Sequence, residues 1–153
     1  MCGLDVQCIT GKMEGVSHMW NIIKLDGEYY HVDVTSDDPT PDDGNRLIYS
    51  NFNLTDEQIS EKHTWDTSQF PKCTATKYNY YDYYGLVATN YSELQNIINS
   101  ALSKGQKTIT FETRNYILNS SNDIKSLFQG KGFSSIYITG DFGEAGAFSI
   151  TVS

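Results

Sequence analysis

The feature that most constrains the fold is the dipeptide Asp26-Gly27, which separates two runs of alternating apolar and polar residues. The runs cover 18–25 and 28–35. Asp-Gly is among the strongest short signals for a β-hairpin, because a type I′ turn needs positive φ at both central positions. A two-residue loop would also fix the register of the two flanking strands. The sequence therefore predicts an antiparallel hairpin over these residues.

The register of this hairpin places a histidine and an aspartate on one face. Trp20 would lie opposite Asp33 and His18 opposite Thr35, so His18 and Asp33 become diagonal neighbours roughly 7–8 Å apart at Cα. Across that gap the carboxylate can hold the imidazole in one tautomer and leave the other nitrogen to take a proton from a nucleophile. A three-residue loop would turn Asp33 to the opposite face. His31 shares the face of Asp33 and competes for it, although its position near the turn predicts exposure.

Composition and charge exclude several classes of function. Lys and Arg total 11 against 19 Asp and Glu, a net charge of −8, which argues against a nucleic-acid partner. No stretch approaches the roughly 20 apolar residues of a membrane span, and no signal peptide opens this chain. The cysteines Cys2, Cys8 and Cys73 cannot all pair and match no zinc spacing. We expect no disulfide scaffold, metal or cofactor.

The region around the hairpin contains further strand and loop signals. A strand is predicted over 3–11, followed by a flexible stretch over 11–15. The acidic segment 36–45 is predicted to be a surface loop, and it fails the calcium-loop template at positions six and twelve. A strand is predicted over 46–53, and 55–58 has the capping-box pattern that begins a short helix.

The second half of the chain changes character after a tyrosine-rich segment over 78–84. Those tyrosines could form a carbohydrate-stacking surface, or they could cover the join between two subdomains. The remaining pattern predicts a β-α-β-α-β-β module with strands over 84–89, 108–113, 135–139 and 147–152. Its first helix begins with the capping box Ser92 to Gln95 and ends at Gly105, and its second helix lies around 124–128. We expect an α+β fold divided into 1–77 and 78–153.

The hairpin residues resemble a known family. The residues that match its His and Asp block are Trp20, Asn21, Gly27, Tyr30, Val32, Asp33 and Thr35, together with His18. This block resembles that of transglutaminase-like domains, which are cysteine acyltransferases and peptidases of papain-like fold. The resemblance covers about half of the chain, from the strand over 3–11 to about Cys73, as in a bacterial variant. It implies an antiparallel sheet from such a domain, with His18 and Asp33 as two members of a Cys-His-Asp triad.

The sequence departs from this family at the nucleophile. The family's catalytic cysteine opens a helix that precedes the strand matched by 3–11, and that helix is absent from this sequence. Cys2 lacks a helix N-terminus, Cys8 lies within a strand, and Cys73 has no partner motif. Ser17 adjoins His18 without nucleophile-elbow glycines. We therefore expect a domain whose front has been removed, and a chain that has no acyl-transfer or peptidase activity alone.

The resemblance also sets expectations for partners and location. It implies a protein or peptide substrate in the full-length protein and an extracellular or cell-surface location. The surface left by the missing helix is expected to favour self-association into a homo-oligomer. The alternative is a non-catalytic cell-surface module that binds a protein or glycan through the tyrosine-rich segment and the acidic surface.

Overall fold

The structure is a computed structural model that describes residues 3–37 and 49–153. Strand accounts for 34% of the described residues and helix for 23%, with mostly antiparallel pairing, so the fold is α+β. The chain divides into two units, Met1–Tyr83 and Tyr84–Ser153. The sequence-based boundary after residue 77 differs from this division. The ring of Tyr80 stacks on Tyr49 at 3.8 Å, which keeps this segment with the first unit.

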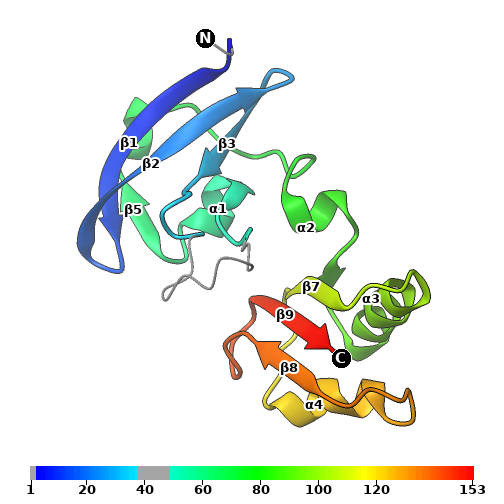
Figure 1. Ribbon diagram of the computed structural model, residues 1–153. Helices are drawn as coiled ribbons and strands as arrows, with labels where there is room; N and C mark the ends of the chain where they lie inside the picture. Colours follow the sequence, from blue (N-terminus) through cyan, green and yellow to red (C-terminus); the bar gives the residue numbers. More distant parts are fainter. Residues whose placement is uncertain (1–2, 38–48) are drawn as a thin grey trace. The chain divides into compact units, whose positions relative to one another are not determined.

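The first unit is built on a five-stranded sheet with the order β4-β3-β2-β1-β5, in which long, curved β1 and β2 are prominent (Figure 1). All four neighbouring pairs are antiparallel. The elements of this unit are β1 (Asp5–Met13), β2 (Val16–Leu25), β3 (Glu28–Val32), β4 (Phe52–Leu54), α1 (Asp56–Ile59), β5 (His63–Trp65), the 3₁₀ turn η1 (Thr67–Gln69) and α2 (Tyr80–Tyr83).

The predicted β2–β3 hairpin and its turn are confirmed. Asp26 and Gly27 have φ values of 50° and 89°, as a type I′ turn requires, and Leu25 pairs with Glu28. The ladder stops one residue before the predicted pairing of Asp33 with Trp20: Val32 is the last residue of β3 to pair with β2. The N–H of Asp33 instead donates to the carbonyl of Asn51 at 2.9 Å. This bond holds Asp33 at the end of the strand.

The prediction of a flexible stretch over 11–15 is wrong. β1 continues to Met13 and turns tightly into β2, with Gly11 paired to His18 on one side and to Trp65 on the other. A Cβ on Gly11 would lie 2.3 Å from the carbonyl oxygen of Thr64 and 2.8 Å from the ring of Trp20. The glycine therefore permits the close approach of β5 and the indole, rather than flexibility.

One face of the first sheet packs into a core that includes residues from α1 and the following loop. The buried members of this core are Ile9, Trp20, Ile22, Leu54, Ile59 and Cys73. The predicted capping box is confirmed: Thr55 accepts from the N–H of Gln58, whose side chain accepts from the N–H of Thr55. The opposite face of β1 and β2 exposes apolar residues, among them Val6 and Met19.

The second unit has the predicted β-α-β-α-β-β order. Its sheet has the order β6-β7-β9-β8, with β6 parallel to β7 and the other pairs antiparallel. Its elements are β6 (Val87–Ala88), α3 (Tyr91–Ser103), β7 (Thr108–Thr113), α4 (Ser121–Lys125), the 3₁₀ turn η2 (Ser126–Phe128), β8 (Ile136–Thr139) and β9 (Ala147–Val152). Alternate residues of β7 and β9 pack with both helices in one core.

The start of α3 differs from the prediction, and part of the segment 36–53 lies outside the described residues. α3 is capped by the side chain of Asn90, which accepts from the N–H of Glu93, rather than by the predicted box starting at Ser92. Most of the predicted acidic loop over 36–45, and the first part of the strand predicted over 46–53, fall outside the described residues. No helix in 3–37 or 49–153 has the length and apolar character needed to span a membrane.

Candidate functional site

His18 and Asp33 lie in direct contact. The Nε2 atom of His18, on β2, is 2.7 Å from Oδ2 of Asp33, which follows β3. The side chain of His18 is 19% exposed and that of Asp33 is 1% exposed. The ionised carboxylate accepts from Nε2, so Nδ1 of His18 carries the lone pair that can take a proton. The structure thus brings together both site residues predicted from the sequence.

Asp33 is surrounded by hydrogen-bond donors. Ser36 donates from its backbone N–H to Oδ1 at 3.2 Å and from its hydroxyl to Oδ2 at 2.6 Å. His63 adds a contact of 2.9 Å to the same Oδ2. Burial raises the pKa of Asp33, but the hydrogen bonds from Ser36, His63 and His18 outweigh burial, so the pKa lies below its ordinary value. Asp33 is therefore a carboxylate at neutral pH.

His63 is a further residue of the site, and the local sequence pattern does not identify it. β5 pairs with the end of β1, where His63 lies opposite Met13, and this pairing carries the imidazole to Asp33. The only local signal was the alternation in His63-Thr64-Trp65, which places the histidine and the tryptophan on one face of a short strand. Nothing in that pattern identifies the strand with which it pairs.

The prediction that His31 is exposed is wrong. Its side chain is 0% exposed, its Nδ1 accepts from the indole N–H of Trp20 at 3.0 Å, and its Nε2 lies 2.8 Å from Oδ1 of Asp56. Because Nδ1 accepts a hydrogen bond, His31 is the neutral tautomer with its proton on Nε2. Burial lowers the pKa of His31 despite the opposing effect of Asp56. His31 therefore belongs to a structural network and does not compete for Asp33.

Trp20 joins the two histidine–aspartate networks. Its ring is stacked on that of His18 with centroids 6.1 Å apart, and it meets the ring of His63 edge-on at 4.9 Å. On another side it packs edge-on against Trp65 at 5.8 Å and donates to His31. These contacts hold the histidines in fixed orientations, which is the function of a supporting layer beneath a reactive group.

No described cysteine is placed to serve as the nucleophile for His18. Cys8 pairs with Asn21, three positions from the pair Gly11–His18, so its side chain projects from the opposite face of the sheet. Cys73 is 0% exposed, and burial together with Asp56 raises the pKa of its thiol to about 12. Ser17 also faces away from His18 by strand alternation. Cys2 lies outside the described residues.

Thiol labelling tests this placement. We expect iodoacetamide to modify the exposed Cys8 in the folded protein, while Cys73 reacts only after denaturation, because a buried protonated thiol is a poor nucleophile. Peptide mapping by mass spectrometry would separate the two sites. Labelling of Cys73 in the folded protein at the rate of Cys8, with loss of that labelling in His18→Ala, would show that Cys73 is the partner of His18.

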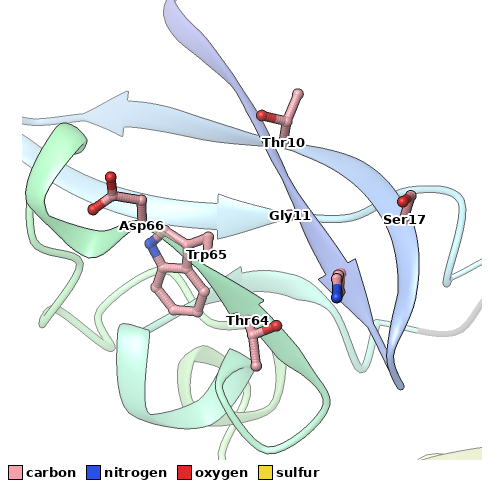
Figure 2. Close-up of a pocket in the computed structure, with 7 residues that line it drawn as sticks. Thr10, Gly11, Ser17, Thr64, Trp65 and Asp66 are labelled. Atoms are coloured by element: carbon pink, nitrogen blue, oxygen red, sulfur yellow. The ribbon is translucent and has the colours of Figure 1, made fainter.

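A shallow depression on the first unit lies beside β1 and β5 (Figure 2). It is lined by Thr10, Gly11, Lys12, Ser17, Thr64, Trp65 and Asp66. Strand alternation places Lys12 and Ser17 on the face of the sheet opposite His18. Neither His18 nor Asp33 lines the depression, and no histidine or thiol is among its lining residues.

Within residues 3–37 and 49–153, two groups of side chains have the atoms to hold a metal ion, but neither has suitable outer contacts. In the group His18, Asp33 and His63, a metal on Nε2 of His63 would move the proton to Nδ1, which is buried without an acceptor among the described residues. In the group His31, Asp56 and Cys73, a metal on Nε2 of His31 would move the ring proton to Nδ1. That proton would then face the indole N–H of Trp20, which is also a donor. Metal-binding histidines normally donate their second N–H to an acceptor.

The tyrosine-rich segment is largely engaged within the first unit. Tyr81 is 2% exposed, and Tyr78 packs edge-on against Tyr30 at 5.9 Å. Tyr83 and Tyr84 are 61% and 62% exposed. The packed tyrosines do not form a continuous exposed stacking surface. Binding of a glycan or a protein by this segment remains a prediction made from the sequence.

Asp37 gives the site a testable pH dependence. Burial raises its pKa to about 6, against the opposing hydrogen bonds from Asn51, and the charge of Asp33 raises it further. Between the ordinary value of 3.8 and about 6 the folded state binds more protons than the unfolded state, so the free energy of unfolding falls as pH rises through this window. Asp37→Asn should remove that fall and raise the free energy of unfolding at pH 7 by about 1 kcal/mol after allowance for solvent screening.

Urea unfolding at pH 4, 5, 6 and 7 would measure this effect. In Asp37→Asn the difference from the wild type should grow from pH 4 to pH 7, and the oxygen of the introduced amide can still accept from the N–H of Asn51. A difference that is constant across these pH values would contradict the assignment.

Comparison with known proteins adds no assignment. No protein-family model matches the chain, and a search of the curated proteins finds no match.

Proposed function

We propose that this chain carries the proton-transfer part of a thiol acyltransferase or peptidase site. In this proposal His18 acts as general base and then as general acid, and Asp33 orients it. The strongest support is the 2.7 Å contact between His18 Nε2 and Asp33 Oδ2, made by a partly exposed imidazole on a buried carboxylate. The resemblance of residues 18–35 to the His and Asp block of transglutaminase-like domains supports the same two roles.

The proposed reaction begins with a thiol placed near Nδ1 of His18. The thiol proton moves to Nδ1, and the sulfur forms a bond to the carbon of a peptide or glutamine side-chain carbonyl. The tetrahedral adduct then breaks its C–N bond, and the proton on Nδ1 passes to the leaving nitrogen. Water or an amine next attacks the thioester carbon and gives its proton to Nδ1. The C–S bond then breaks, and the proton on Nδ1 returns to the sulfur, which restores the thiol and the neutral imidazole. Throughout, Asp33 accepts from Nε2 and stabilises the imidazolium.

The thiol in this proposal comes from outside the described residues, either from another part of the protein or from another chain. This follows from the positions of Cys8 and Cys73, of which one faces away and the other is buried with a raised pKa. The roles of His18 and Asp33 can still be tested directly, because a small thiol in solution can replace the missing one.

The test measures thiolysis of an activated ester. Wild-type protein is mixed with 2-mercaptoethanol and the 4-nitrophenyl ester of an N-acylglycine, and release of nitrophenolate is followed by absorbance. Nitrophenolate leaves without a proton, so this assay isolates the general-base step. We expect wild type to exceed His18→Gln by about 10²-fold, the lower range for general-base catalysis.

Ser17→Ala is the matched control, since Ser17 is exposed beside His18 but faces the other way. This variant should keep the wild-type rate. Equal rates for wild type and His18→Gln, with both proteins folded by circular dichroism, would overturn the proposed function.

A further inference from the structure

Asp33 is shared by two imidazoles that lie in different surroundings. His18 approaches Oδ2 from β2 with 19% of its side chain exposed, whereas His63 approaches the same oxygen from β5 with 1% exposed. The ring centroids of the two histidines are 5.7 Å apart. One imidazole is therefore accessible to a reactant, and the other supports the carboxylate from the buried side.

The protonation state of His63 follows from its surroundings. Its Nδ1 is buried and has no hydrogen-bond partner among the described residues. A proton on Nδ1 would be a buried donor without an acceptor, which costs more free energy than a bare lone pair in the same place. His63 is therefore held as the neutral tautomer with its proton on Nε2, and it donates to Oδ2 of Asp33 at 2.9 Å.

His63 cannot readily move away from this contact. Its backbone pairs with Met13 of β1, and its ring meets the indole of Trp20 edge-on at 4.9 Å. Asp33 is held equally firmly, because its N–H donates to the carbonyl of Asn51 and its carboxylate accepts from Ser36. The buried donor thus fixes the carboxylate oxygen at a point that His18 can reach.

We propose that His63 is a positioning residue that holds Asp33 ionised and aims its Oδ2 at His18. This inference deepens the proposed function, and it rests on that function only in assuming that the His18–Asp33 pair transfers a proton in catalysis. The contact itself can be tested without any acyl-transfer activity. A result against His63 and a result against the proposed function can therefore be told apart.

The first measurement uses wild-type protein. Long-range ¹H–¹⁵N NMR correlations distinguish the two neutral tautomers and the imidazolium by the shifts of the ring nitrogens. We expect His63 to show a protonated Nε2 and a bare Nδ1 at neutral pH. A protonated Nδ1, in either the neutral or the charged ring, would overturn the proposal.

The second measurement follows the carboxyl ¹³C shift of Asp33 with pH. His63→Leu should raise the pKa of Asp33 by about one to two pH units, since a hydrogen bond to the charged form is lost. His63→Gln should restore most of the wild-type value, because its amide supplies an N–H at a similar reach. His18, Ser36 and the nearby Asp37 are unchanged in both variants.

His31→Gln is the control for loss of a buried imidazole, because His31 contacts Asp56 rather than Asp33. It should leave the titration of Asp33 at its wild-type midpoint. An unchanged midpoint in His63→Leu, or equal changes in His63→Leu and His63→Gln, would overturn the positioning role. If His63→Leu does not fold, the tautomer of His63 in the wild-type protein decides the question, because a proton on Nδ1 overturns the proposal.

Discussion

Replacement of Asp33 by asparagine is expected to reduce His18-dependent thiolysis about 10²-fold, to the level of His18→Gln. The carboxylate oxygen Oδ2 accepts from His18, His63 and Ser36 at 2.6–2.9 Å. An amide has no charge to stabilise the imidazolium, and its NH₂ group repels donors if it turns toward them. The loss of rate should therefore exceed the loss expected when a single hydrogen bond at the surface is removed.

Asp37→Asn provides the matched control for this experiment. It removes a negative charge from the same turn, and its contacts are with Asn51 rather than with His18. We expect Asp37→Asn to keep the wild-type rate of thiolysis. If Asp33→Asn also keeps the wild-type rate while His18→Gln loses it, His18 acts without Asp33 and the paired mechanism is wrong.

The largest loss of stability is expected for Trp20→Ala. The indole is 3% exposed, packs against the rings of His63 and Trp65, and donates to Nδ1 of His31. Removing a buried indole typically lowers the free energy of unfolding by about 3–5 kcal/mol. This variant also removes the surface against which His18 stacks. Urea unfolding of the full chain, monitored by circular dichroism, would measure the change in the free energy of unfolding.

Trp20→Phe separates packing from hydrogen bonding at the same position. Phenylalanine keeps much of the buried ring but leaves Nδ1 of His31 without its donor, which costs about 1–3 kcal/mol. We expect Trp20→Phe to lie between wild type and Trp20→Ala in stability. A loss in Trp20→Ala no greater than in Trp20→Phe would show that the ring contacts contribute little.

The parts of the fold encoded locally were predictable. Asp26-Gly27 specifies the turn through its positive φ values, and the turn then fixes the β2–β3 register and the face of His18. The capping box at Thr55 and the apolar spacing of 94–102 similarly predicted helices that are present. The start of α3 was misplaced because Asn90 and Ser92 are both good cap residues, and only the backbone geometry distinguishes them.

The parts that depend on distant contacts were not predictable. β5 pairs with β1 across about fifty residues, and no local pattern in His63-Thr64-Trp65 specifies that partner. The local pattern therefore does not identify His63, and it predicts an exposed His31 because Asp56, the partner of His31, lies beyond the hairpin. The sequence predicts flexibility at Gly11 because the close approach of Thr64 and Trp20 to this glycine exists only in the folded sheet.

The proposed roles of His18 and Asp33 require a proton on Nε2 of His18, between the imidazole and the carboxylate. Imidazole ¹⁵N shifts of wild-type protein, recorded at a pH where the His18 ring is neutral, would locate it directly. We predict a protonated Nε2 and a bare Nδ1, with loss of this preference in Asp33→Asn. A proton on Nδ1 of His18 in the wild type would contradict the account, because the ring would then have no lone pair to offer a thiol.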